Sequence, residues 1–135
     1  MNVENTQVQM RKGILEFCIL HIISRGEIYS SDIIQELREA KIIVVEGTLY
    51  PLLTRLKKAG LLSYNWKESS AGPPQKHYQL TNKGEEFLEQ LNETWIGLVE
   101  STNKIITRAS IERFQKVPQI DLEMLKVQRK LRNVI

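Results

Sequence analysis

The stretch from Val45 to Gly84 constrains the fold of this chain more than any other. It opens with V-E-G-T-L-Y-P-L-L-T-R-L-K-K-A-G, in which leucines recur at the three- and four-residue steps that line one side of an α-helix. These leucines are Leu49, Leu52, Leu53 and Leu56. We therefore predict a helix with one buried side, and we expect Pro51 about one turn from its start, where a missing amide donor costs least.

The side of this helix opposite the leucines is small, polar and basic. It carries Gly47, Pro51, Thr54 and Lys58, flanked by Thr48, Tyr50, Arg55 and Lys57. No acidic residue occurs between Gly47 and Lys58. Glycine and threonine let the backbone come close to a ligand, while arginine and lysine neutralise phosphates or read guanine edges. The pattern predicts a face that binds nucleic acid; an ordinary solvated helix face has the same composition and stays open as the alternative.

Two strands hinged on a Gly-Pro-Pro turn are predicted after this helix. Apolar and polar residues alternate in both, which gives each strand one half-buried face. That face is expected to carry Leu62, Tyr64, Trp66, Tyr78 and Leu80. Residues 69–75 contain the glycine and paired prolines of a stiff turn, and Gln75 and Lys76 at its end can reach a phosphate or the minor groove. A purely structural hairpin is the alternative.

Two further helices are predicted before this unit. Residues 6–25 are apolar nearly all round, so this helix must be buried on several sides, and Gly26 is expected to end it. The next helix is predicted to begin after Tyr29, with residues 30–32 as N-cap candidates. The β-branched run 42–45 is expected to form a short strand against the hairpin. This order of elements is that of a winged helix-turn-helix, a mainly α fold with a small β-hairpin.

The motifs of this region resemble those of the PadR family of transcriptional regulators. G-T-L-Y-P-L-L-T-R-L-K-K-A-G-L-L, G-P-P-Q-K-H-Y and L-T-N-K-G are similar to its signature, and R-K-G-I-L-E and I-Y-S-S-D-I fit its first two helices. The resemblance covers residues 10–84 closely and implies a DNA-binding regulator. The residues expected at the DNA are Tyr29, Ser30, Glu46, Gly47, Thr48, Tyr50, Pro51, Thr54, Arg55, Lys57, Lys58, Gly72, Gln75 and Lys76.

Three positions depart from the pattern of that family. Gln75 stands where the family often has arginine, His77 replaces an aromatic residue, and Lys57 occupies a position where an acid is frequent. These departures weaken the contact expected of the hairpin and strengthen that of the helix. The operator sequence therefore does not carry over from relatives.

A long helix with a heptad seam is predicted after the hairpin. Thr81 is its N-cap candidate, and the helix is expected to continue to about Arg113, before Pro118. Its seam is Leu88, Leu91, Trp95, Leu98, Thr102, Ile105 and Ala109. A stripe of this length cannot be buried on one small domain, so it predicts a homodimer.

The chain is thus predicted to have three parts. Residues 1–80 form a winged-helix DNA-binding domain, and residues 81–117 form a dimerisation helix. Residues 118–135 place apolar side chains at helical spacing among basic ones, and they are either a further helix or a basic, partly ordered tail.

Trp95 lies on the seam of the predicted dimerisation helix, where two-fold symmetry can bring it close to its mate. Some multidrug-sensing members of the PadR family have a tryptophan in the matching helix that stacks on flat ligands. The resemblance therefore implies a pocket for a small planar aromatic effector, formed by Leu91, Trp95, Leu98 and Val99. The alternative is that Trp95 is a large side chain filling the dimer core.

Composition bounds the remaining possibilities. The chain has 135 residues with a net charge of +3, so the case for DNA rests on the local patch and not on total charge. It lacks a membrane-spanning apolar run and a signal-peptide pattern, and Cys18 is its one cysteine, which together predict a cytoplasmic protein.

No motif in the sequence indicates catalysis. His21 and His77 lack a matching carboxylate or cysteine cluster, and no phosphate-binding loop or nucleophile elbow occurs, so we expect neither enzyme activity nor a metal or cofactor. Together with the heptad seam, the resemblance to the PadR family implies a ligand-responsive repressor that binds a pseudo-palindromic operator in double-stranded DNA as a homodimer. A winged-helix module for protein–protein contact, without a DNA target, is the alternative.

Overall fold

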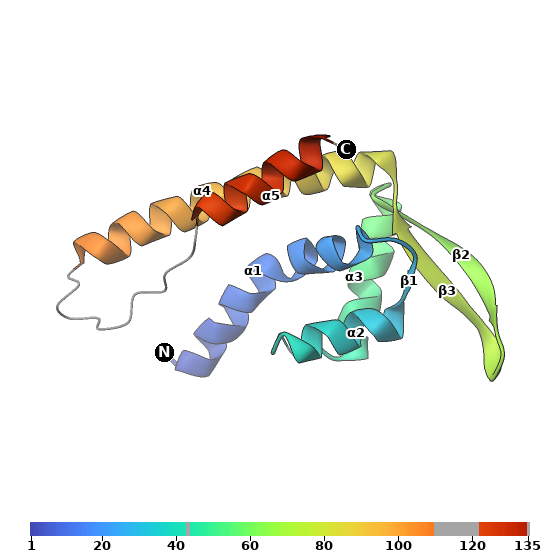
Figure 1. The fold of residues 1–135 in the computed structure, drawn as a ribbon. Coiled ribbons are helices and arrows are strands. Elements are labelled where there is room, and N and C mark those ends of the chain that lie inside the picture. Colours follow the sequence, from blue (N-terminus) through green and yellow to red (C-terminus); the bar gives the residue numbers. More distant parts are fainter. Residues whose placement is uncertain (43, 110–121, 135) are drawn as a thin grey trace. The chain divides into compact units, whose positions relative to one another are not determined.

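A computed structural model describes residues 1–42, 44–109 and 122–134 of the chain. Its elements are, in order, α1 (Val3–Ile23), β1 (Ile28–Tyr29), α2 (Ser30–Glu39), α3 (Glu46–Lys58), β2 (Leu62–Ser69), β3 (Gly72–Leu80), α4 (Asn82–Arg108) and α5 (Leu122–Val134) (Figure 1). The chain divides into two compact units, Met1–Leu88 and Glu89–Ile135. The predicted fold class, mainly helical with a small antiparallel sheet, is confirmed.

The core of the first unit is built from leucine and isoleucine side chains of its first three helices. The fully buried ones on these helices are Ile19, Leu20, Ile23, Ile33, Leu37, Leu49 and Leu53. Of the four leucines predicted to form the buried side of α3, Leu49, Leu53 and Leu56 are buried and Leu52 is half-buried. α1 begins at Val3, earlier than expected, because the side chain of Asn2 accepts a hydrogen bond from the Glu4 amide at 2.8 Å.

The sheet has three antiparallel strands in the order β1-β3-β2. Ile28 pairs with Tyr78 and Tyr29 with His77, so the short third strand comes from the segment before α2. β2 and β3 pair as the predicted hairpin, in register from Leu62 opposite Leu80 to Lys67 opposite Gln75; the register shifts before Ser69, which stands opposite Gly72.

The predicted strand at residues 42–45 is wrong: Ile42, Val44 and Val45 lie in no strand, and position 43 is outside the described residues. Ile42 instead takes part in the end of α2, and Val45 in the start of α3. Lys41 has a φ of 66°, and the Ile42 amide donates to the Leu37 carbonyl at 2.8 Å, which ends α2. Val45 is then the N-cap of α3.

Two other local predictions need correction. The N-cap residue of α2 is Tyr29, not one of residues 30–32, and it makes no side-chain capping bond. α3 begins at Glu46, so Pro51 is the sixth residue of the helix and lies beyond its first turn. Pro51 therefore has no N–H to give to the carbonyl of Gly47, and that helical hydrogen bond is missing.

The C-terminal end of α3 is closed by a glycine turn. Gly60 has a φ of 81°, which favours glycine, and the Leu61 amide donates to the Leu56 carbonyl at 3.0 Å. The hydroxyl of Thr81, just before α4, donates to the Gly60 carbonyl at 2.6 Å. The last turn of α3 is therefore fixed by residues from outside the helix.

The start of α4 is held against the same turn. The Thr81 hydroxyl accepts from the Gly84 amide at 3.0 Å, which confirms Thr81 as the N-cap, and the Lys83 amino group donates to the Ala59 carbonyl at 2.9 Å. A Cβ added to Gly84 would lie 2.1 Å from the Leu61 carbonyl oxygen. The L-T-N-K-G motif thus has a structural explanation: it joins the end of α3 to the start of α4.

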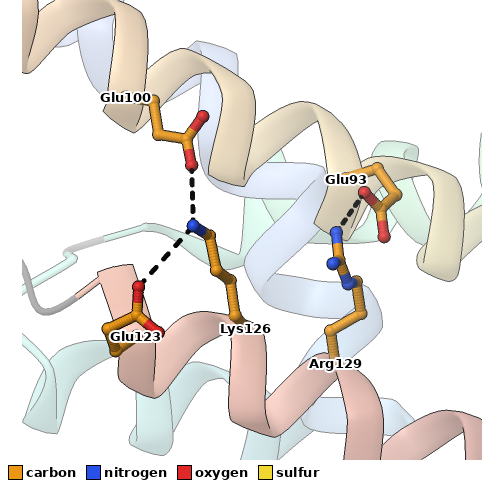
Figure 2. A network of polar contacts seen from close by, with 5 residues as sticks. All are labelled: Glu93, Glu100, Glu123, Lys126 and Arg129. Atoms are coloured by element: carbon orange, nitrogen blue, oxygen red, sulfur yellow. Dashed lines mark hydrogen bonds and ion pairs between the residues drawn. The ribbon is translucent and has the colours of Figure 1, made fainter.

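In the second unit, α5 is joined to α4 by ion pairs, which Figure 2 shows. Arg129 pairs with Glu93 at 2.6 Å, and Lys126 pairs with Glu100 at 3.6 Å and with Glu123 at 3.7 Å. Leu122–Val134 forms a helix, and these ion pairs link it to α4. The predicted end of α4 near Arg113, and Pro118, lie outside the described residues.

Candidate nucleic-acid interface

The face of α3 opposite its buried leucines is open to solvent. Every α3 residue that was predicted to contact DNA is exposed. These residues are Glu46, Gly47, Thr48, Tyr50, Pro51, Thr54, Arg55, Lys57 and Lys58. At about 100° per residue, Gly47, Pro51, Thr54 and Lys58 form its middle row. Small side chains fill most of this row, so another molecule can come close to the helix backbone.

Ser30 and Tyr50 are brought together at one edge of α3, and Tyr29 contacts the hairpin. The hydroxyls of Ser30 and Tyr50 are 3.2 Å apart, which links the first turn of α2 to α3. The ring of Tyr29 contacts the ring of His77 edge to face. The structure therefore joins two of these three predicted residues, Ser30 and Tyr50, and directs the ring of Tyr29 towards β3.

Arg55, on another edge of α3, forms an ion pair with Glu16 of α1. The side chain of Arg55 is 66% exposed and that of Glu16 is 31% exposed. Sequence reasoning did not single out Glu16. The available signal was a lone acid inside the apolar run I-L-E-F-C-I-L, because a charge in such a place needs a partner.

Lysines and aromatic rings form a row that leads from α3 along the hairpin. The Lys57 amino group lies 4.9 Å from the centre of the Tyr64 ring. The Lys76 amino group lies 4.5 Å from the same ring and 5.3 Å from that of Trp66. We call Lys57, Tyr64, Trp66 and Lys76 the lysine–aromatic row. Of these, sequence reasoning missed Tyr64 and Trp66 as parts of the site.

Trp66 corrects the prediction of one half-buried face along the whole hairpin, because it is 62% exposed. The same face is buried at Leu62 and Tyr78, and it becomes exposed towards the turn. Across β3, Trp66 stands opposite Lys76 and not opposite an apolar residue. Alternation of side chains gives the faces of a strand but not the length of strand that the helices cover.

The other face of the hairpin carries a neutralised lysine. Lys67 pairs with Glu27, and this contact holds the pKa of the Glu27 carboxyl below its ordinary value. Nδ1 of His77 lies 3.8 Å from the same carboxylate, and the His77 side chain is buried. Gly72 and Gln75, the remaining predicted residues of the hairpin, are exposed.

The four residues predicted to form an effector pocket differ in burial. Leu91 and Trp95 are half-buried, Leu98 is 55% exposed, and Val99 is buried. An open groove of about 500 Å³ lies along α4. It is lined by Glu100, Asn103, Lys104, Thr107 and Arg108, which are polar and do not include the predicted four.

Two further observations limit the chemistry of the described part of the chain. None of its helices combines the length and apolar character needed to cross a membrane. Cys18 is half-buried, and this burial raises the pKa of its thiol, which disfavours the reactive thiolate.

Known proteins share both the sequence and the fold. Residues 19–90 match the transcriptional regulator PadR-like family. A PadR-like transcription factor from Bacteroides fragilis is 58% identical, with 75% of this chain and 98% of that one covered and a TM-score of 0.64. A PadR-like transcriptional regulator from Bacillus cereus is 39% identical, with 73% and 96% covered and a TM-score of 0.66. A PadR family regulator from Eggerthella lenta is 28% identical, with 77% and 91% covered and a TM-score of 0.71.

Proposed function

Because the chain belongs to the PadR-like family of transcriptional regulators, we propose that it is a ligand-responsive repressor that binds a pseudo-palindromic operator as a homodimer. Its family is one of regulators and not of enzymes.

The observation that carries the DNA proposal is the outward face of α3. All of its predicted contact residues are exposed, and no acid interrupts it from Gly47 to Lys58. A helix with small residues in its middle row can enter a major groove, where Thr48 and Tyr50 near its start contact base edges or thymine methyls. Lys58 at its end contacts a phosphate.

The hairpin extends this surface on the side of the lysine–aromatic row. Lys57 belongs to α3 and Lys76 to β3, and both lie over the Tyr64 ring. We propose that Lys76, with Gly72 and Gln75 nearer the turn, contacts the backbone beside the groove that α3 occupies. The row supports this proposal because it continues the positive charge of α3 along the hairpin.

The homodimer proposal rests on the seam of α4. Leu98 and Ile105 are 55% and 68% exposed in the single chain, which leaves apolar area for a second copy to cover. Helical spacing puts Leu98 on the opposite side of α4 from Glu93 and Glu100, which hold α5. The contact with α5 therefore leaves the seam open.

The effector proposal places a planar aromatic ligand against Trp95 between the two copies. The half-buried Trp95 and the exposed Leu98 support it, whereas Val99 is already buried and would have to be uncovered to contact a ligand. The alternative, Trp95 as packing in the dimer core, predicts that planar dyes bind equally well to the Trp95→Phe protein. Titration should be done against Trp66→Phe, because Trp66 also fluoresces.

The salt dependence of DNA binding tests the central claim. Replacing Lys58 by alanine should weaken binding to all duplexes and flatten the slope of log K against log salt by about one unit. Lys104→Ala, on α4, is the matched control and should leave the slope unchanged. Footprints should show half-sites roughly 34 Å apart. An unchanged slope in Lys58→Ala, or a wild-type protein that binds no duplex, would favour the protein–protein interaction module.

A further inference from the structure

Arg55 differs from the other cationic residues of α3 in the partner it has. It pairs with the carboxylate of Glu16 on α1, whereas Lys57 lies over the ring of Tyr64. At about 100° per residue, Arg55 shares one flank of α3 with Thr48. The arginine thus stands at an edge of the proposed DNA-binding face and is tied to a different helix.

The partner of Arg55 is partly withdrawn from water. The Oε1 atom of Glu16, which faces Nη2 of Arg55, is buried and has no hydrogen-bond partner in the described part of the chain apart from this ion pair. If Arg55 swung away to a phosphate, the Oε1 atom of Glu16 would lose the guanidinium that contacts it. The Arg55 side chain is 66% exposed and that of Glu16 is 31% exposed, so the pair is only partly withdrawn from water, but Oε1 has no other partner in the described residues to replace the guanidinium. Arg55 is therefore expected to keep Glu16 when DNA is bound.

We infer that Glu16 is a positioning residue of the DNA interface that holds Arg55 against α1 and cancels its charge. This inference rests on the proposed function of α3. One amino group of the guanidinium is committed to Glu16, and its other N–H donors remain at the flank that carries Thr48. Arg55 then contributes directed hydrogen bonds but little net charge, so it adds little to sequence-independent attraction.

The pairing of Arg55 with Glu16 should be visible in the salt dependence of DNA binding. Each phosphate neutralised by a protein cation adds roughly 0.9 to the slope of log K against log salt. A guanidinium whose charge is already balanced adds little to that slope. Glu16 therefore lowers binding to non-specific DNA more than binding to an operator, where the directed hydrogen bonds of Arg55 are also used.

The experiment compares salt slopes of variants on one probe, a mixed-sequence duplex of about 30 base pairs, on which binding is almost wholly electrostatic. Glu16→Gln keeps the shape and an acceptor oxygen but removes the charge, so the slope should steepen by about one unit and low-salt affinity should rise several-fold. Glu36→Gln is the matched control: Glu36 pairs with Arg25 elsewhere in the same unit, so this variant changes net charge equally, and its slope should stay as in wild type.

A double variant, Glu16→Gln with Arg55→Gln, removes both charges of the ion pair and tests whether wild-type Arg55 neutralises a phosphate. It should restore the wild-type slope, because wild-type Arg55 carries little free charge. A double-variant slope about one unit flatter than wild type would overturn the inference, since Arg55 would then have been engaged with a phosphate. So would a Glu16→Gln slope that matches Glu36→Gln. Thermal melts of each variant establish that it is folded, and the double variant alone decides the question if Glu16→Gln is not.

The same measurements distinguish a failure of the role of Glu16 from a failure of the proposed DNA-binding function. Wild-type protein that binds no duplex at low salt overturns both. Binding that is present and salt-dependent, with no effect of Glu16→Gln, overturns the role of Glu16 and leaves the DNA-binding function standing.

Discussion

The two ends of α3 are held in different ways. At the C-terminal end, Thr81 donates to the carbonyl of Gly60 and Lys83 to that of Ala59, so a second helix caps the last turn. At the N-terminal end, the cap residue is Val45, which is 65% exposed and makes no side-chain capping bond. One end is closed by the chain itself, and the other is left open.

The difference corresponds to the two tasks that α3 has in the proposed repressor. The closed end fixes the direction of α3 against the start of α4, the helix proposed to carry the dimer seam. At the open end the Thr48 amide donates to the Val45 carbonyl at 2.9 Å, and the Val45 side chain caps none of the first-turn amides, so an outside acceptor such as a DNA phosphate can take that place. Side chains cap α1 at Asn2 and α4 at Thr81, whereas α2 and α3 begin at Tyr29 and Val45 without a side-chain capping bond. A local rule is therefore broken at the proposed functional surface.

The largest effect is expected from Gly84→Ala at the closed end. A Cβ there would lie 2.1 Å from the Leu61 carbonyl oxygen, so the backbone at the junction must shift. We expect a loss of about 3 kcal/mol in the free energy of unfolding, measured by urea denaturation at fixed protein concentration. Gly97→Ala is the control, because a Cβ there meets nothing within 4 Å. It should gain about 0.5–1 kcal/mol, and equal effects at the two glycines would mean that the junction is loose.

A smaller loss is expected from Thr81→Ala, which removes two hydrogen bonds without adding an atom. The hydroxyl caps α4 through the Gly84 amide and donates to the Gly60 carbonyl. We expect the free energy of unfolding to fall by about 1–2 kcal/mol. Thr107→Ala, at an exposed site on α4, is the control and should change stability little. A Thr81→Ala protein as stable as this control would show that the closed end does not depend on the threonine.

The contrast between the two ends also shows how far sequence reasoning reached. The leucine period predicted the buried side of α3, and Thr81 was recognisable as a cap because caps are local signals. The contact of Gly84 with the Leu61 carbonyl joins residues far apart in the sequence, and no periodicity reports it. β1 was missed for a related reason: at two residues it has no alternation to detect, and its pairing with β3 is tertiary.

The candidate site was predicted to a similar extent. Every α3 residue placed at DNA proved exposed, since helical spacing determines which residues share a side. The partner of Arg55 was not predicted, because an ion pair between α1 and α3 depends on how the helices cross. Trp66 was expected to be half-buried, yet it is 62% exposed, because alternation along a strand does not show which part of the strand the helices cover.

The smallest effect, and the one that tests the open end most directly, is expected from Val45→Ser. Val45 has φ −91° and ψ 156°, an extended conformation that suits an N-cap, and its side chain is mostly exposed, so little packing is lost. A serine hydroxyl can accept from a first-turn amide and should raise the free energy of unfolding by about 0.5–1 kcal/mol.

If that end of α3 is open in order to bind a phosphate, the same serine should compete with DNA for the amides. Affinity for duplex DNA should then fall a few-fold while stability rises, and the salt slope should not change because no charge is altered. Val45→Ala removes the branched side chain without supplying an acceptor, and it should have neither effect. A Val45→Ser protein that is more stable and binds DNA as tightly as wild type would mean that the first turn of α3 does not contact a phosphate. The missing cap would then be unrelated to DNA binding.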